Sequence, residues 1–130
     1  MAKRIIPAQM QSYYDGYHFA PAVVDGKHVR CSGVIGTNLS DGTVSDDPVT
    51  QFKQAFDNLK LVLKEAGVSF ADVTEMTTFH VGLQEHIETF IGVKDQYMKE
   101  PYCAWTAIGI TELAIPGGIV EIRVTARKPD

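Results

Sequence analysis

The feature that most restricts the fold is an apolar stripe at helical spacing near the middle of the chain. Its members recur every three or four residues, which places them on one side of an α-helix: Phe52, Ala55, Phe56, Leu59, Val62, Leu63 and Ala66. Asp47 can cap the helix, Pro48 suits its first position, and Gly67 predicts its end. A helix with one apolar side needs a second layer to pack against, so the flanking segments must supply one.

The flanking segments supply strands and a second helix. Asp25-Gly26 predicts a hairpin turn, because glycine accepts the positive φ that such turns need. Strands are predicted at residues 22–24, 28–32, 73–81, 105–111 and 119–126, and a second helix at 84–99, before Pro101. The order β-β-α-β-α-β-β predicts an α+β fold with one mixed β-sheet and two helices packed on one face. A length of 130 residues suits a single domain spanning 1–130.

Composition argues against several kinds of partner. The net charge is −4 and the 12 basic residues are scattered, which argues against a nucleic-acid partner. No segment reaches the roughly 18 apolar residues of a membrane span, and the N-terminal residues do not resemble a signal peptide. We therefore expect a cytoplasmic protein, with no membrane partner, whose Cys31 and Cys103 stay reduced. The four histidines lack metal-ligand spacing, so no metal site is predicted: His18, His28, His80 and His86.

Side chains alternate between the two faces of a strand, which predicts what each face of the sheet carries. The set expected under the helices is apolar: Val29, Cys31, Ile108, Ile110, Val120, Ile122 and Val124. The set expected on the opposite face is mixed: His28, Arg30, Ser32, Trp105, Ala107, Gly109, Glu121, Arg123 and Thr125. A helix-free face that carries a large indole favours an interface between copies of the chain. The alternative is a half-solvated antiparallel face with one exposed tryptophan.

Three blocks of the sequence occur in the order found in one known family. The first is Ser32-Gly33 after the second predicted strand, and the second is the helical run 51–67. The third combines residues 106–110 with Leu113-Ala114, Pro116-Gly117 and residues 120–122. Together these blocks resemble the RidA/YjgF superfamily, also called the endoribonuclease L-PSP family. The similarity covers the chain from about Phe19 onward.

The resemblance implies a fold, an assembly and a reaction. The implied fold is a chorismate-mutase-like α+β domain. The implied assembly is a homotrimer whose sheets face inward and leave three clefts between subunits. The best-studied branch of the family hydrolyses reactive enamines and imines, derived from amino acids, to 2-oxo acids and ammonia. That branch uses no metal and no cofactor of its own, so we expect none here and a small-molecule metabolite as the partner.

The resemblance also implies roles for the residues that match the family's site. Glu121 matches a glutamate that positions or activates the attacking water, which makes it the expected catalytic residue. Ser32 and Gly33 are retained as substrate contacts, and Thr106 and Ala107 belong to the same binding set. The alternative for Glu121 is an ion pair with Arg123, Arg30 or a neighbouring subunit.

Three further positions depart from the family's best-studied branch. Trp105 stands where that branch has an arginine that holds the substrate carboxylate, so the chain is a divergent member. An indole cannot form the two parallel hydrogen bonds that a guanidinium forms with a carboxylate. Phe19 occupies a tyrosine position and Lys94 an asparagine position. Trp105, Phe19 and Lys94 are therefore expected to shape an altered substrate pocket.

Several alternatives remain open from the sequence. Arg30, Arg123 or Lys94 is a candidate to replace the missing cation. Trp105 either stacks on a flat ligand or simply fills an interface. Cys103 is either a nucleophile near the cleft or a small buried residue. Two functions follow: a RidA-like hydrolase or deaminase with an altered imine or enamine substrate, or a non-catalytic trimeric module that binds a metabolite or partner in the same cleft.

Overall fold

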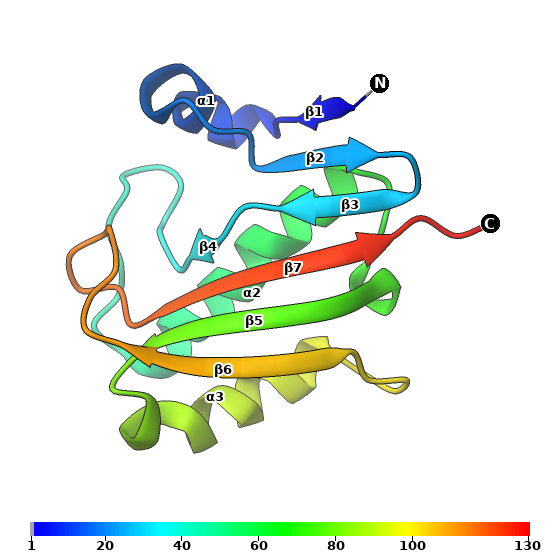
Figure 1. The fold of residues 1–130 in the computed structure, drawn as a ribbon. Coiled ribbons are helices and arrows are strands. Elements are labelled where there is room, and N and C mark those ends of the chain that lie inside the picture. The colour runs from blue at the N-terminus through cyan, green and yellow to red at the C-terminus, as the bar shows by residue number, and fades with distance from the viewer. Residues whose placement is uncertain (1) are drawn as a thin grey trace.

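A seven-stranded mixed sheet forms the centre of the molecule in the computed structural model, which describes residues 2–130 (Figure 1). The strands are β1 (Lys3–Ile5), β2 (Ala22–Asp25), β3 (His28–Cys31), β4 (Val34–Ile35), β5 (Val73–Val81), β6 (Ala104–Ile110) and β7 (Val120–Arg127). The α-helices are α1 (Gln11–Tyr17), α2 (Pro48–Glu65) and α3 (Leu83–Tyr97), and two 3-10 helices span Ala8–Met10 and Phe70–Asp72. The strand order is β1-β2-β3-β7-β5-β6, and β4 also pairs with β7.

One parallel pair makes the sheet mixed. Strands β5 and β6 run parallel, and every other pair is antiparallel. Parallel neighbours need a long crossover connection, which α3 supplies between them. Helices α2 and α3 lie side by side behind the same face of the sheet (Figure 1). The predicted α+β architecture with both predicted helices on one face is confirmed.

The predicted central helix begins and ends at its predicted residues. The backbone N–H of Thr50 donates to Oδ2 of Asp47 at 3.0 Å, and Pro48 is the first helical residue. At the other end Gly67 adopts a φ of +80°, a conformation that other residues rarely adopt. All seven residues of the predicted stripe are buried, each with at most 3% of its surface exposed.

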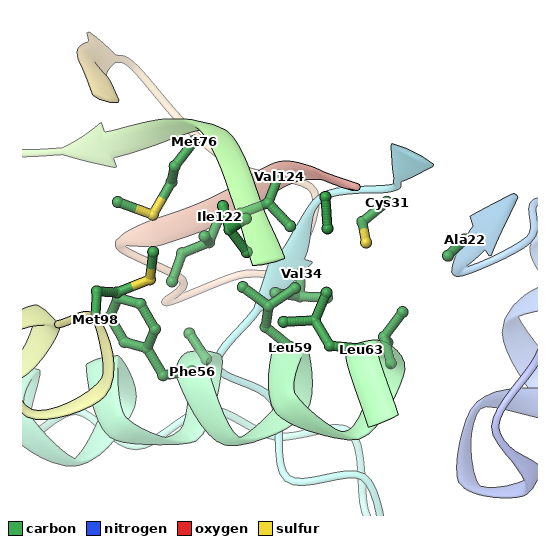
Figure 2. Packing of buried hydrophobic residues seen from close by; sticks show 14 of the residues in the cluster. Ala22, Cys31, Val34, Phe56, Leu59, Leu63, Met76, Met98, Ile122 and Val124 are labelled. Atoms are coloured by element: carbon green, nitrogen blue, oxygen red, sulfur yellow. The ribbon is translucent and has the colours of Figure 1, made fainter. Parts of the chain in front are cut away.

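The main core lies between α2 and the sheet. Figure 2 shows Met76, Ile122 and Val124 pointing from the sheet toward helix α2. Val120, Ile122 and Val124 are exposed by no more than 2%, which confirms the predicted alternation along β7. Val29 and Cys31 are likewise buried, and His28 and Arg30 are exposed, as the hairpin pattern predicts.

Two buried polar residues on α2 fix the loops at one end of the sheet. The side-chain amide of Gln51 donates to the carbonyls of Ser45 and Gly117, and its Oε1 accepts from the N–H of Ile119 at 2.6 Å. About two turns further on, Asn58 donates to the carbonyls of Ile35 and Thr37 at 3.0 and 2.8 Å. These bonds hold the segment after β4 and the loop before β7 against the same helix.

Five elements of the fold were missed by the sequence-based predictions. Strand β1, helix α1, strand β4 and both 3-10 helices were not predicted. Cys31 and Cys103 are both free. Within residues 2–130, no helix has the length and apolar character required to cross a membrane.

Candidate functional site

A cavity of about 240 Å³ opens between helix α1, the β3–β4 segment and the loop that connects β6 to β7. Four of the residues predicted for the substrate site line it: Phe19, Ser32, Gly33 and Glu121. The structure therefore brings together residues that are separated by as many as 102 positions in the chain. We refer to this cavity as the Glu121 pocket.

Glu121 lies on β7, on the helix-free face, and its carboxyl group reaches the pocket wall at Gly33. A Cβ atom placed on Gly33 would lie only 2.6 Å from Cδ and 2.9 Å from Oε2 of Glu121. The absence of a side chain at Gly33 thus creates the space that the carboxyl group occupies. Burial raises the pKa of Glu121 above its usual value, and the positive charge of Arg123 opposes this rise. A half-buried carboxylate with a raised pKa is a stronger base than an exposed one.

The aromatic wall of the pocket comes from a helix that the sequence analysis missed. Tyr13 and Tyr17 are one turn apart on α1, and Phe19 follows the helix. The rings of Tyr13 and Phe19 stack with centroids 5.6 Å apart, and those of Tyr13 and Tyr17 lie 6.4 Å apart. The spacing of Tyr13 and Tyr17 by four residues was the available signal for this wall.

The polar side chains of the wall are held by the protein itself. The hydroxyl of Ser32 donates to the carbonyl of Ala20 at 2.7 Å. Asn58 uses both amide hydrogens on backbone carbonyls, and its Oδ1 accepts from Gln54 at 2.8 Å. The hydroxyls of Tyr13 and Thr37 pair with each other at 3.2 Å. Asn58 was also missed, although a polar residue within an otherwise apolar helical stripe is a recognisable signal of a buried hydrogen-bonding role.

Trp105 does not share the face of Glu121, so that prediction is wrong. On β5, Met76 pairs with both Trp105 and Val124, whereas Phe79 pairs with Glu121. Neighbours in register share a face, so Trp105 lies on the helix-bearing side with the buried Val124. The predicted positions of Ala107 and Gly109 are wrong for the same reason.

Strand β6 therefore has the reverse of its predicted alternation. Thr106, Ile108 and Ile110 lie on the helix-free face, and Ile108 is 40% exposed. The helix-bearing side of the strand carries Trp105, Ala107 and Gly109 instead, and a Cβ on Gly109 would approach Cβ of Leu83 to 3.4 Å. The predicted burial of Ile108 and Ile110 under the helices is wrong, because their partners in register on β5, Phe79 and Val81, lie on the face opposite the buried Met76.

Trp105 belongs to a second cluster, on the helix-bearing side of the sheet edge. Its indole N–H donates to Oγ1 of Thr78 at 2.9 Å, and its ring packs against Phe90 at 5.9 Å between centroids. The ammonium nitrogen of Lys94 lies 5.1 Å from the indole centroid and 5.9 Å from that of Tyr102. Lys94 also forms an ion pair with Asp95 at 3.1 Å.

Beneath the indole a completely buried histidine joins the same network. Nε2 of His80 lies 2.7 Å from Oγ1 of Thr78, the atom that also accepts from Trp105. Nδ1 of His80 has no hydrogen-bond partner within the described part of the chain. Burial, with a smaller contribution from the charge of His86, lowers the pKa of His80 from 6.5 to about 4. His80 is thus held neutral under the sheet edge.

The candidate replacement cations and the candidate nucleophile lie away from the Glu121 pocket. Arg30 and Arg123 share the helix-free face with Glu121, as predicted, but both are exposed and neither lines the cavity. The guanidinium carbon of Arg123 lies 5.8 Å from the ring centroid of Phe79. Burial raises the pKa of Cys103, which disfavours the thiolate that a nucleophile requires. Across residues 2–130, no group of three or more His, Cys, Asp or Glu residues is arranged to hold a metal ion.

Comparison with known proteins identifies the family. The sequence profile of the family described as Endoribonuclease L-PSP matches residues 12–128. The chain belongs to the endoribonuclease L-PSP family. This family member is 36% identical over 127 residues to the RutC family protein YjgH of Escherichia coli K12, covering 97% of the chain and 95% of that protein. The solved structure of YjgH covers 98% of the chain, and 97% of the YjgH chain is matched, with a TM-score of 0.89.

More distant relatives of this family member carry an enzymatic name. It is 28% identical over 112 residues to the 2-iminobutanoate/2-iminopropanoate deaminase of Dermatophagoides farinae, with 85% of the chain and 86% of the relative covered. The yeast protein YEO7 shares the fold, with a TM-score of 0.87 at 19% identity, over 99% of the chain and 100% of the other. The chorismate-mutase-like α+β fold that the sequence resemblance implies is confirmed.

Proposed function

We propose that this protein hydrolyses a small reactive imine or enamine, with Glu121 as the catalytic residue. The observation that carries the proposal is the placement of the Glu121 carboxyl group in the wall of an apolar cavity, against Gly33. Relatives named as 2-iminobutanoate/2-iminopropanoate deaminases, at 26% to 29% identity, support the reaction class. The altered site favours a substrate other than that of those relatives.

The proposed reaction needs one group that moves protons. The Glu121 carboxylate accepts a proton from water as the water oxygen bonds to the imine carbon, and the C=N electron pair moves to nitrogen. The resulting carboxylic acid returns the proton to that nitrogen. The C–N bond then breaks as the hydroxyl oxygen forms C=O, and its proton passes through Glu121 to the departing amine. The products are a carbonyl compound and an amine or ammonia.

The proposal includes a homotrimer in the cytoplasm. The helix-free face carries Phe79, Ile108 and Ile110, and exposed apolar side chains on an open sheet favour contact with another copy. Trp105 and Glu121 lie on opposite faces of one subunit, so only an assembly could bring their surfaces to one cleft. Two free cysteines favour a reducing compartment. Light scattering during gel filtration should give three times the 14.3 kDa chain mass, and Ile108→Lys should lower it. A monomeric parent protein contradicts the assembly.

The predicted binding roles divide between two surfaces. Phe19, Ser32 and Gly33 are proposed as substrate contacts because they line the Glu121 pocket. Thr106 lies on the same side of the sheet as Glu121, whereas Lys94, Trp105 and Ala107 lie on the other side. The latter three can contribute to a substrate site only from a neighbouring subunit.

A non-catalytic binding module is the second candidate, and the composition of the pocket favours it. The wall is mostly apolar, and the side chains of Ser32 and Asn58 donate their hydrogen bonds to backbone carbonyls. Such a wall can hold a ligand without supplying further proton donors for chemistry. This candidate predicts tight ligand binding without turnover.

The test uses an imine that an L-amino-acid oxidase generates in place and semicarbazide as a competing trap. Added protein should lower the yield of semicarbazone by accelerating hydrolysis, and Glu121→Gln should abolish that effect. Glu88→Gln is the matched control, because Glu88 is exposed on the helix-bearing side, away from the pocket. Unchanged semicarbazone yield with imines of several sizes, together with retained ligand binding, would favour the binding module.

A further inference from the structure

We propose that the Glu121 pocket selects a small organic cation with a flat apolar body and no carboxylate group. The inference rests on the proposed function, because it names the substrate class of that hydrolase: the iminium form of an amine-derived imine. Three features of the wall support it: its charge, the engagement of its Ser32 and Asn58 donors by backbone carbonyls, and its aromatic rings.

The charge of the wall is negative. Glu121 reaches the cavity, and within residues 2–130 no lysine, arginine or histidine lines it. A substrate carboxylate would therefore meet a like charge without a cation to balance it, which is unfavourable in a partly buried site. A protonated nitrogen would instead pair with Glu121 through a charge-assisted hydrogen bond.

Two side-chain donors of the wall, Ser32 and Asn58, are already engaged by backbone carbonyls. The Ser32 hydroxyl donates to Ala20, and both hydrogens of the Asn58 amide are used on Ile35 and Thr37. Breaking these bonds to bind an anion would leave backbone carbonyls unpaired. Neither Ser32 nor Asn58 is therefore free to donate to a ligand carboxylate.

The aromatic rings add attraction for positive charge. Tyr13 and Phe19 stack 5.6 Å apart, and Tyr17 extends the same wall toward the solvent with 74% of its surface exposed. Ring faces attract cations within about 6 Å, and they also stack on flat apolar groups. A ligand with a ring and a protonated nitrogen matches both the wall and Glu121.

The nearby cations are held elsewhere. The Arg123 guanidinium lies over Phe79 and projects from the exposed helix-free face. Lys94 lies across the sheet, paired with Asp95 and packed between Trp105 and Tyr102. A neighbouring subunit is the only route by which Lys94 could enter the pocket, and the experiment therefore includes Lys94→Met.

Three probes of one shape separate charge from size: phenethylamine, its neutral analogue 2-phenylethanol and its carboxylated analogue L-phenylalanine. Calorimetry at pH 7 on the full chain should show phenethylamine binding at least about tenfold more tightly than either other probe. Glu121→Gln should remove that preference, while Glu88→Gln should retain it. Because Glu121→Gln replaces only one carboxylate oxygen by an amide nitrogen, its circular dichroism spectrum should match that of the parent.

Several results would overturn the inference. L-phenylalanine binding as tightly as phenethylamine would do so, most directly if Lys94→Met then weakened L-phenylalanine. Failure of all three probes to bind at millimolar concentration would also overturn it.

A paired hydrolysis assay separates this inference from the proposed function. A flavin amine oxidase acting on phenethylamine and an L-amino-acid oxidase acting on L-phenylalanine supply imines that differ only in the carboxylate. A larger increase in the hydrolysis rate of the uncarboxylated imine than of the carboxylated imine supports both proposals. Equal, Glu121-dependent acceleration of the two imines keeps the hydrolase and overturns the cation preference. Preferential phenethylamine binding without acceleration of either imine keeps the cation site and overturns the hydrolase.

Discussion

Trp105 and Glu121 lie on opposite faces of the central sheet, in register with Met76 and Phe79 of the strand between them. The two residues therefore belong to two different sites of the same chain. Glu121 reaches an aromatic-walled pocket, whereas Trp105 covers a buried Thr78–His80 pair and packs under Lys94. The Trp105 indole is fixed by its contacts with Thr78 and Phe90 of the same chain.

Loss of the Thr78 hydroxyl should destabilise the fold more than loss of the single hydrogen bond that the Trp105 indole donates to it. Thr78→Val leaves both Trp105 Nε1 and His80 Nε2 without a partner and should cost about 2 kcal/mol of unfolding free energy. Trp105→Phe removes one hydrogen bond and should cost about 1 kcal/mol. Urea unfolding gives both values. Thr77→Val, on the opposite face, is the control and should change stability by less than about 0.5 kcal/mol. A smaller loss for Thr78→Val than for Trp105→Phe would contradict this network.

Gly33→Ala should separate the function of the pocket from the stability of the fold. The new Cβ would collide with the flexible end of Glu121, so the carboxyl group should swing away while the backbone stays in place. Glu121-dependent binding or hydrolysis should fall about tenfold, with a stability loss of about 1 kcal/mol. Gly92→Ala is the matched control: it meets no atom within 4 Å on helix α3, and it should stabilise the protein by about 0.5 to 1 kcal/mol without affecting activity. Unchanged activity in Gly33→Ala would show that the position of the carboxyl group is unimportant.

Glu121→Gln should raise stability at neutral pH. The folded protein raises the pKa of Glu121, so the charged form costs folding free energy above that pKa and the cost disappears as the carboxyl is protonated. The substitution should therefore add about 0.5 to 1 kcal/mol at pH 7, limited by solvent screening of a half-exposed group, and less in acid. Thermal melts across pH 4 to pH 7 measure the difference. A destabilised variant at pH 7 would mean that the carboxylate has a stabilising partner in the folded protein.

His80 should make the protein sensitive to acid. Its folded pKa is lowered from 6.5 to about 4, so between these values the unfolded chain binds a proton that the folded chain does not. Stability should fall by about 3 kcal/mol from this residue as the pH drops from above 6.5 to about 4. Denaturant unfolding of His80→Gln over this range should show a correspondingly shallower loss. His28→Gln, at an exposed position on β3, should keep the parent's slope; equal slopes in all three proteins would exclude His80 as the source.

The elements that were predicted well are those in which burial follows a simple period. Helix α2 and strand β7 each bury one regular set of apolar residues, because each packs on the core along its whole length. The hairpin around Asp25-Gly26 is equally regular, and its β2 and β3 strands pair as predicted. Glu121, Ser32, Gly33 and Phe19 were found together because the family resemblance and the fold agree on their position.

Strand β6 shows where apolar character misleads. Large isoleucines look like core residues, but Ile108 and Ile110 on this edge strand are in register with Phe79 and Val81 and lie on the helix-free face. Helix α1 was not predicted for a different reason. None of its seven residues is buried, so its sequence has no apolar stripe to detect.

The hydrogen bonds of Gln51 with Ser45, Gly117 and Ile119 connect helix α2 to the loop before β7. That loop also carries Ala114 and Ile115, which form part of the cavity rim. A ligand that shifts this rim should therefore disturb the hydrogen bonds of Gln51 in the first turn of α2. A change in the hydrogen–deuterium exchange rates of the backbone amides in that turn should therefore report a bound ligand, even a ligand that gives no spectroscopic signal of its own.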